Sequence, residues 1–171
     1  DQVDVVTLKL GSRSEKIATA TELVATVFDW ARKVGVSQPL TVGVWEYDKD
    51  GQLVNNALNQ LIVDQSDIIS FHCYEPREKL TAVINALATH GRPLLCTEWL
   101  ARSAGSTVDL LSVFKDAGVG AINWGFVDGR TQTRFPWRSW TEPVNNDEPW
   151  FHELLHPDGT AYDVQEVETF R

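Results

Sequence analysis

One glutamate in this sequence stands where a folded chain places catalytic groups. Glu98 is the last residue but one of the largely apolar run RPLLCTEW (92–99). Glutamate is depleted in strands, and the C-terminal tip of a parallel strand is where α/β folds carry their reactive side chains. Glu98 is therefore the leading candidate for a nucleophile. The alternative is a strand-end carboxylate with a purely structural ion pair, for which Arg102 is a partner.

The run before it ends in two side chains that can support such a carboxylate. DIISFHCY (67–74) carries His72 and Tyr74, which are two positions apart and therefore share one face of a strand. On a neighbouring strand, Tyr74 can donate a hydrogen bond to Glu98 and fix its rotamer, as a nucleophile requires. We expect His72 and Tyr74 to belong to the same catalytic group, although a lone His-x-Tyr pair is more often structural.

Tryptophan is the next signal, with seven residues in a chain of 171. Indole rings stack on the flat apolar faces of sugars, although core packing is the simpler use of a tryptophan. Trp124, near the end of VGAINWGFV (119–127), is the candidate stacking platform. The other candidate substrate-binding residues stand near predicted strand ends or in the aromatic stretch that follows: Trp45, Trp99, Asn123, Asp128 and Trp137.

A repeating pattern of strands and helices positions these residues. Four apolar, β-branched runs begin at nearly constant intervals, with amphipathic helical patterns between them. Parallel βα units give this alternation, either in a doubly wound sheet or in part of a (β/α)8 barrel. The predicted strands are 39–45, 67–74, 92–99 and 119–127, and the predicted helices are 53–63, 75–90 and 106–117, the last with Ser106 as a possible N-cap.

The two ends of the chain are less regular. Residues 3–10 alternate apolar and polar positions as a fifth strand would, and 21–33 form an amphipathic helical pattern. Residues 128–171 contain an aromatic loop and a C-terminal segment with a Pro-Asp-Gly turn and a final helical stretch. No linker interrupts the sequence, so we expect one α/β domain over 1–171.

Composition argues against several classes of function. The 15 Lys and Arg against 24 Asp and Glu give a net charge of −9, so we expect neither nucleic acid nor a membrane as a partner. No signal-peptide pattern opens the chain.

The histidines are scattered, and His152 and His156 read as a surface pair, so we expect no metal and no cofactor. Cys96 faces the same side of its predicted strand as Glu98, whereas Cys73 faces the side opposite to His72. We therefore expect Cys73 and Cys96 to be buried thiols without a disulfide.

Five motifs, taken in order, resemble one known family. They are SDIISFHCY, GRPLLCTEWLAR, INWGFVDGRTQT, PWRSW and EPWFHELLHPDGTAYD. From about residue 20 to residue 171 the chain resembles the C-terminal half of cellulase-like and xylanase-like glycoside hydrolases, the retaining clan that includes family 5. The resemblance implies a (β/α)8 barrel, a β-linked plant polysaccharide or oligosaccharide as substrate, and a secreted or periplasmic location.

The resemblance also implies a role for each matching residue. The four predicted strands become strands five to eight of the barrel, and Glu98 matches the nucleophile on strand seven. His72 and Tyr74 match the strand-six pair that supports the nucleophile, and Trp124 matches the sugar platform on strand eight.

The second catalytic carboxylate of such enzymes has no match in this chain. In the family the general acid/base is a glutamate in an Asn-Glu pair at the end of strand four, and the corresponding stretch VDVVTLKLGSRSEK contains no such pair. Retaining hydrolysis needs two carboxyl groups about 5–5.5 Å apart. Glu46, next to Trp45, is the best substitute and Asp128 the next, although both read more readily as solvated loop charges.

The length of the chain sets a limit on the fold. A complete barrel takes about 250 residues, whereas this sequence has 171 and supplies four or five strands. An open half-barrel exposes two strand edges and an apolar inner face. We therefore predict half of a (β/α)8 barrel, completed by a second copy in a homodimer.

Three functions stay open at this point. The first is a glycoside hydrolase with Glu98 as nucleophile and a proton donor from Glu46 or from a second copy. The second is a catalytically incomplete half-barrel that only binds carbohydrate. The third is an esterase-like or lipase-like hydrolase in which Ser12 or Ser14 joins His72 and a carboxylate in a triad. No Gly-x-Ser-x-Gly motif supports that third function.

Overall fold

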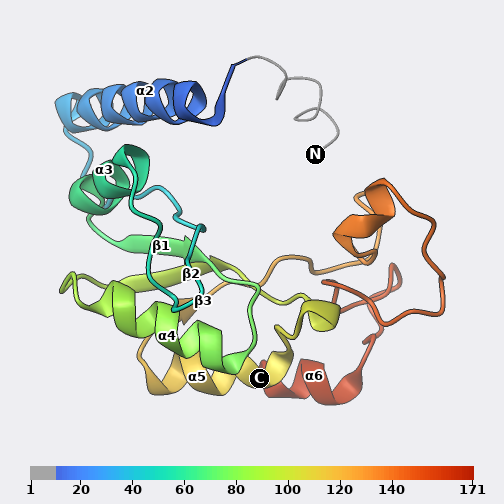
Figure 1. The fold of residues 1–171 in the computed structure, drawn as a ribbon. Coiled ribbons are helices and arrows are strands. Elements are labelled where there is room, and N and C mark those ends of the chain that lie inside the picture. Colours follow the sequence, from blue (N-terminus) through green and yellow to red (C-terminus); the bar gives the residue numbers. More distant parts are fainter. Residues whose placement is uncertain (1–10) are drawn as a thin grey trace.

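A small parallel sheet forms the centre of the fold. The computed structural model describes residues 11–171, so the strand predicted at 3–10 lies outside the described residues. The sheet has three strands in the order β1 (Ile69–His72), β2 (Leu94–Glu98) and β3 (Gly120–Ala121) (Figure 1). Helices separate consecutive strands, so the predicted mixed α/β class is confirmed. The described residues do not form a closed barrel.

The segment predicted as a strand at 39–45 lies beside β1 but pairs with it at one point only. Val44 forms a parallel bridge to Phe71. The Val44 N–H donates to the Ser70 carbonyl at 3.1 Å, and the Val44 carbonyl accepts from the His72 N–H at 2.9 Å. The regular strand predicted here is therefore reduced to a single bridge at the edge of the sheet.

β3 is also much shorter than the predicted strand 119–127. Past its end the Trp124 N–H still donates to the Trp99 carbonyl at 2.9 Å. Gly125 then adopts a φ of +83°, which turns the chain away from the sheet. The segment loses strand geometry early, but this last hydrogen bond still brings Trp124 to the end of β2.

Two helices that flank β1 lie close to their predicted positions. α3 (Ala57–Gln65) starts later than predicted because the Asn56 side chain accepts a hydrogen bond from the first turn. α4 (Arg77–Ala88) lies within the predicted 75–90. Its first turn follows Pro76, which suits the start of a helix because proline has no N–H to satisfy.

The helix predicted at 106–117 is present as a short turn followed by α5 (Leu111–Asp116). Ser106 is not its N-cap, because the Ser106 hydroxyl instead accepts a hydrogen bond from the Leu100 N–H at 3.2 Å. The Ser106 side chain is fully buried. It therefore satisfies the backbone of the chain that leaves β2 rather than starting the next helix.

α2 (Arg13–Val34) begins well before residue 21, where the apolar pattern predicts its start. Ser12 and Glu15 form a capping box, in which each side chain accepts a hydrogen bond from the backbone N–H of the other. Gly35, with a φ of +75°, ends the helix. The Ser-x-x-Glu motif was the signal for the earlier start.

One hydrophobic core holds the sheet to its helices. Figure 1 shows α4 and α5 below the sheet and α2 with α3 above one end of it. From the sheet the core takes Ile69, Phe71 and Cys96, all without exposed surface or nearly so. The helical residues packed in the same core include Ile62, Val63, Leu80, Val83, Ile84, Leu87 and Phe114.

The C-terminal part of the chain is mostly irregular. It contains a short 3-10 helix at Trp137–Trp140 and the helix α6 (Val164–Thr169), which agrees with the predicted final helical stretch. Within residues 11–171, no helix combines the length and the apolar character that crossing a membrane requires.

Candidate functional site

The ends of β1 and β2 bring His72, Tyr74 and Glu98 together. The Tyr74 hydroxyl donates to Glu98 Oε2 at 2.9 Å, and His72 Nδ1 lies 3.3 Å from the same oxygen. A register shift after Phe71 pairs His72 with Glu98 across the sheet. The hydrogen bond from Tyr74 to Glu98 that the sequence predicts is therefore present. Tyr74 and His72 both approach the same oxygen of the Glu98 carboxylate, Oε2.

Tyr74 is held as a hydrogen-bond donor. Burial, and then its bond to Glu98, raises the pKa of the Tyr74 phenol above its usual value. A phenol that keeps its proton can donate to the Glu98 carboxylate at neutral and moderately alkaline pH. The Tyr74 ring also meets the Trp137 ring edge-on, with the centroids 5.1 Å apart.

Room for the His72 ring comes from Gly43, in the segment beside β1. A Cβ atom at position 43 would lie 2.9 Å from His72 Nε2, which is closer than a nonbonded contact allows. Any other residue at this position would push the imidazole or the segment away. Gly43 therefore contributes to the placement of His72, although the sequence pattern at 39–45 indicates only a strand.

Glu98 lies between two adjoining cavities. One has a volume of about 520 Å³ and extends toward Trp124, and the other, of about 530 Å³, extends toward Trp45. Tyr74, Glu98 and Trp137 line both of them. The carboxylate therefore stands at the middle of a long depression, which suits an extended ligand better than a compact one.

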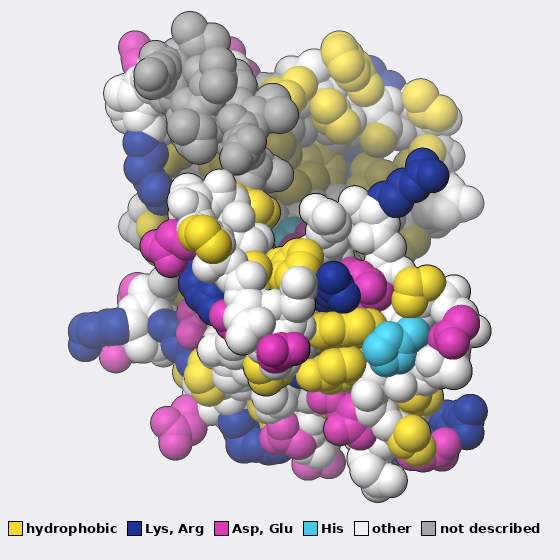
Figure 2. All heavy atoms as spheres, turned by 90° about the vertical axis from the view of Figure 1, so that its right-hand side faces the viewer, with side chains coloured by type: hydrophobic (Ala, Val, Ile, Leu, Met, Phe, Trp, Pro, Cys, Tyr) yellow, Lys and Arg dark blue, Asp and Glu magenta, His cyan; other side chains and the backbone are white. Residues whose placement is uncertain are grey.

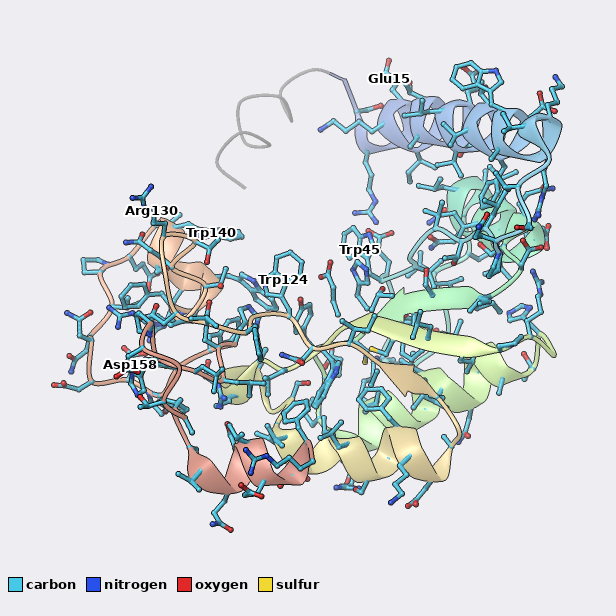
Figure 3. The ribbon with its side chains drawn as sticks, turned by 180° about the vertical axis from the view of Figure 1, so that it is seen from behind. Glu15, Trp45, Trp124, Arg130, Trp140 and Asp158 are labelled. Atoms are coloured by element: carbon cyan, nitrogen blue, oxygen red, sulfur yellow. The ribbon has the colours of Figure 1, made fainter. Side chains whose placement is uncertain are left out.

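Exposed indole rings border this depression. Trp45, Trp124, Trp137 and Trp140 all keep a large part of their side chains accessible. Figure 3 shows Trp45, Trp124 and Trp140 on the same side of the molecule, on the side where α2 lies. In Figure 2 hydrophobic side chains surround a hollow with acidic and histidine atoms in its floor. Rings in such a position can stack on the apolar faces of a sugar chain.

Three residues chosen from the sequence as substrate contacts, Trp99, Asn123 and Asp128, are not among those that line the two cavities. Trp99 is fully buried, and its ring packs against Phe114 with the centroids 5.1 Å apart. It therefore has no exposed face to offer to a ligand. Asn123 lines a separate groove next to α6, and its amide donates to the Gly125 carbonyl.

The two candidate proton donors are both engaged in ion pairs. Glu46 Oε1 lies 2.6 Å from Arg13 Nη2, and Asp128 Oδ2 lies 3.4 Å from Arg134 Nη1. Neither carboxylate is among the residues that line the two cavities. Both side chains are partly buried in these ion pairs, so neither is the solvated loop charge considered above as the alternative.

Several cavity residues were not selected from the sequence. Glu75 lines the second cavity together with Glu98, and it directly follows Tyr74 in the chain. The motif PWRSW was the available signal for Trp140. The motif INWGFVDGRTQT was the available signal for Thr131, Gln132 and Thr133, and EPWFHELLHPDGTAYD for His152. Phe135 lies outside these motifs.

The prediction that His152 is a surface residue is wrong. The side chain is buried, and its Nδ1 is hydrogen-bonded to the Leu100 carbonyl. Burial lowers the pKa of the His152 imidazole, which favours the neutral ring. The spacing to His156 was misleading because this part of the chain is not helical.

Glu153 ties the cavity wall to the core. Its side chain is buried, Oε1 accepts a hydrogen bond from the Thr133 hydroxyl, and Oε2 has no hydrogen-bond partner among the described residues. Burial raises the pKa of the Glu153 carboxyl. Because Thr133 lines the cavity, this buried carboxyl anchors one point of the loop that forms the wall.

Both cysteines are free and buried, as predicted. Burial raises the pKa of the Cys73 thiol to about 11 and also raises the pKa of the Cys96 thiol. Neither thiol is a ready nucleophile at neutral pH.

Comparison with known proteins adds no assignment to this geometry. No protein-family model matches the chain, and no curated protein matches it. Among residues 11–171, no group of three or more His, Cys, Asp or Glu side chains is arranged to hold a metal ion.

Proposed function

We propose that this protein is a glycoside hydrolase that acts on β-linked plant polysaccharide of the cellulose or xylan type, with Glu98 as nucleophile. The observation that carries the proposal is the position of the Glu98 carboxylate. It is hydrogen-bonded to Tyr74, lies within 3.3 Å of His72, and stands in a depression bordered by exposed indole rings.

In this reaction Glu98 attacks the anomeric carbon of the sugar while a second carboxyl group gives its proton to the leaving oxygen. Water then cleaves the glycosyl–Glu98 ester, and the same second group takes up a proton from that water. Tyr74 orients the nucleophile by its hydrogen bond to Oε2. Glu75 and Glu46 are the chain's own candidates for the second group, Glu75 because it lines the cavity and Glu46 because it follows Trp45.

A second candidate function is carbohydrate binding without hydrolysis. It is favoured by the surroundings of Glu46, because this carboxylate is paired with Arg13 and is not among the described residues that line either cavity. The esterase-like function gains no such support. The Ser12 hydroxyl is engaged in the capping box of α2 and is also within 2.9 Å of the Ser14 hydroxyl.

We also propose that the fold is half of a (β/α)8 barrel, which a second copy of the chain completes. The parallel order β1-β2-β3, with Val44 extending it at one edge, is what four neighbouring strands of such a barrel would give. Closure by a second copy would pair both open edges of the sheet.

The test of the hydrolase is an aryl β-glycoside assay on the wild type and on Glu98→Gln. We expect a loss of activity of about 10³-fold or more, because the nucleophile is removed while its shape is kept. Glu78→Gln is the matched control, since Glu78 is an exposed glutamate in the first turn of α4. Activity that survives Glu98→Gln would remove Glu98 from the mechanism. Binding of cellulose or xylan without turnover in the wild type would instead support the second function.

A further inference from the structure

We propose that α2 of one copy docks into the groove beside α6 of a second copy, and that the reverse contact forms at the same time. The proposal deepens the half-barrel arrangement proposed above by naming the surfaces that join the two copies. It does not depend on the hydrolase chemistry.

The first surface is an apolar ridge along α2. Leu23, Val27, Trp30 and Val34 are 61%, 47%, 61% and 79% exposed, and their spacing of four, three and four residues places them in one line. Of all the residues of α2, only Phe28 is buried. A helix that exposes four large apolar side chains in a row presents a surface of the kind that binds a partner.

The second surface is the α6 groove, which has a volume of about 500 Å³. Two of its side chains, Phe126 and Val164, are 65% and 61% exposed. A groove of this kind accepts the apolar stripe of a helix at its i, i+4 and i+7 positions. The apolar residues that line it include Phe126, Leu154, Leu155, Val164, Val167 and Phe170.

The ridge and the groove lie at opposite ends of the molecule. α2 packs on α3, above the edge of the sheet that Val44 extends, whereas the groove lies beyond β3 (Figure 1). A surface and its complement at opposite ends can join two copies about a twofold axis, so that each contact is made twice. Each contact then needs to bury only about 600–1,000 Å² for the pair to reach the area of a specific interface.

Charge also favours this pairing between copies. The chain as a whole carries a net charge of −9, which opposes self-association. The two surfaces contribute little to this repulsion, because cations lie on both of them: Lys33 pairs with Asp29 beside the ridge, and Arg171 pairs with Glu168 at the border of the groove. Each of these two ion pairs is neutral, so at these positions the contact brings no like charges together.

The experiment uses one variant for each surface, Trp30→Asp for the ridge and Val164→Asp for the groove. Both positions are exposed, so both variants should fold, which circular dichroism checks. We expect the wild type to dimerise in analytical ultracentrifugation and each variant to dissociate at a concentration at least about tenfold higher. Asn85→Asp, which adds the same charge on the exposed face of α4, is the control and should dimerise as the wild type does.

The decisive measurement mixes the two variants. A heterodimer of the two variants keeps one intact contact, because the unchanged ridge of Val164→Asp can bind in the unchanged groove of Trp30→Asp. We expect the mixture to form more dimer than either variant alone. A wild type that stays monomeric at about 100 μM, where even a weak specific contact is populated, would overturn the proposal. A mixture of the two variants that forms no heterodimer would also overturn it. So would normal dimerisation of Val164→Asp, since that result would indicate that the ridge does not bind in the groove. Glu98→Gln should dimerise normally, so the outcome is separate from that of the hydrolase test.

Discussion

The two walls around Glu98 are built in different ways. One wall consists of the ends of β1 and β2, where the backbone is paired and Phe71 beneath it has no exposed surface. The other wall is the stretch 128–152, which contains one short 3-10 helix and is held by side-chain contacts such as that between Thr133 and Glu153. The wall that carries the carboxylate is thus the rigid one.

This difference separates two tasks of a binding site. A reactive group needs a fixed position, which a packed strand provides. A surface that receives a polymer needs shape and exposed rings, and an irregular loop can supply both at a small loss of stability if it is anchored at a few points. Four substitutions test whether the two walls divide the work in this way.

The largest effect is expected in the strand wall. Phe71→Ala removes a fully buried ring from the middle of β1, so we expect it to lower the free energy of unfolding by about 3–5 kcal/mol. Urea denaturation followed by circular dichroism measures this change. A loss below about 1 kcal/mol, the size of an ordinary surface effect, would mean that the core beneath Glu98 is not tightly packed.

An intermediate effect is expected at the anchor of the loop wall. Glu153→Ala removes the hydrogen bond to Thr133 and leaves a void, so we expect it to lower the free energy of unfolding by about 1–3 kcal/mol. The raised pKa of Glu153 also makes stability depend on pH. Its contribution is complete below the usual pKa of a glutamate and is lost as the pH rises through the raised value in the folded state.

Glu153→Gln keeps the shape of the side chain and removes the titration. We expect its free energy of unfolding, relative to that of the wild type, to be higher at pH 8 than at pH 5. Denaturation at the two pH values is the measurement. Parallel behaviour of wild type and variant would show that Glu153 ionises normally in the folded protein.

The smallest effect on stability is expected at the rim of the loop wall. Trp140→Ala truncates an exposed ring, so we expect the free energy of unfolding to change by no more than about 0.5 kcal/mol. The affinity of this variant for a cello- or xylo-oligosaccharide should be about three- to tenfold weaker than that of the wild type, because one stacking contact is lost. Isothermal titration calorimetry measures the affinity. Unchanged binding would place the ligand away from this wall.

The sequence allowed the strand wall to be predicted and left most of the loop wall unpredicted. Apolar runs with a fixed parity determine which side chains share a face, so the contact between Tyr74 and Glu98 could be predicted before the fold was known. No such period exists in 128–152. The burial of His152 and of Glu153 depends on distant partners, Leu100 and Thr133, which no local pattern reveals.

The errors at the element ends have local causes. The start of α2 was missed because its capping box lies outside the apolar pattern, and the strand at 39–45 was overestimated because apolar residues on a sheet edge need not pair along their whole length. Trp99 was taken for a sugar contact because it stands at the end of a predicted strand. Adjacent residues of a strand face opposite sides, and Trp99 faces the core.

The capping box and the terminal glycine of α2 have a practical consequence for protein engineering. The helix carries its own start at Ser12 and its own stop at Gly35, so its boundaries are encoded within the segment. A segment transplanted as a unit from Ser12 to Gly35 would carry both signals into another protein. The position of Trp30 relative to the start of the helix would then be preserved in the chimera, which makes this segment suitable for grafting.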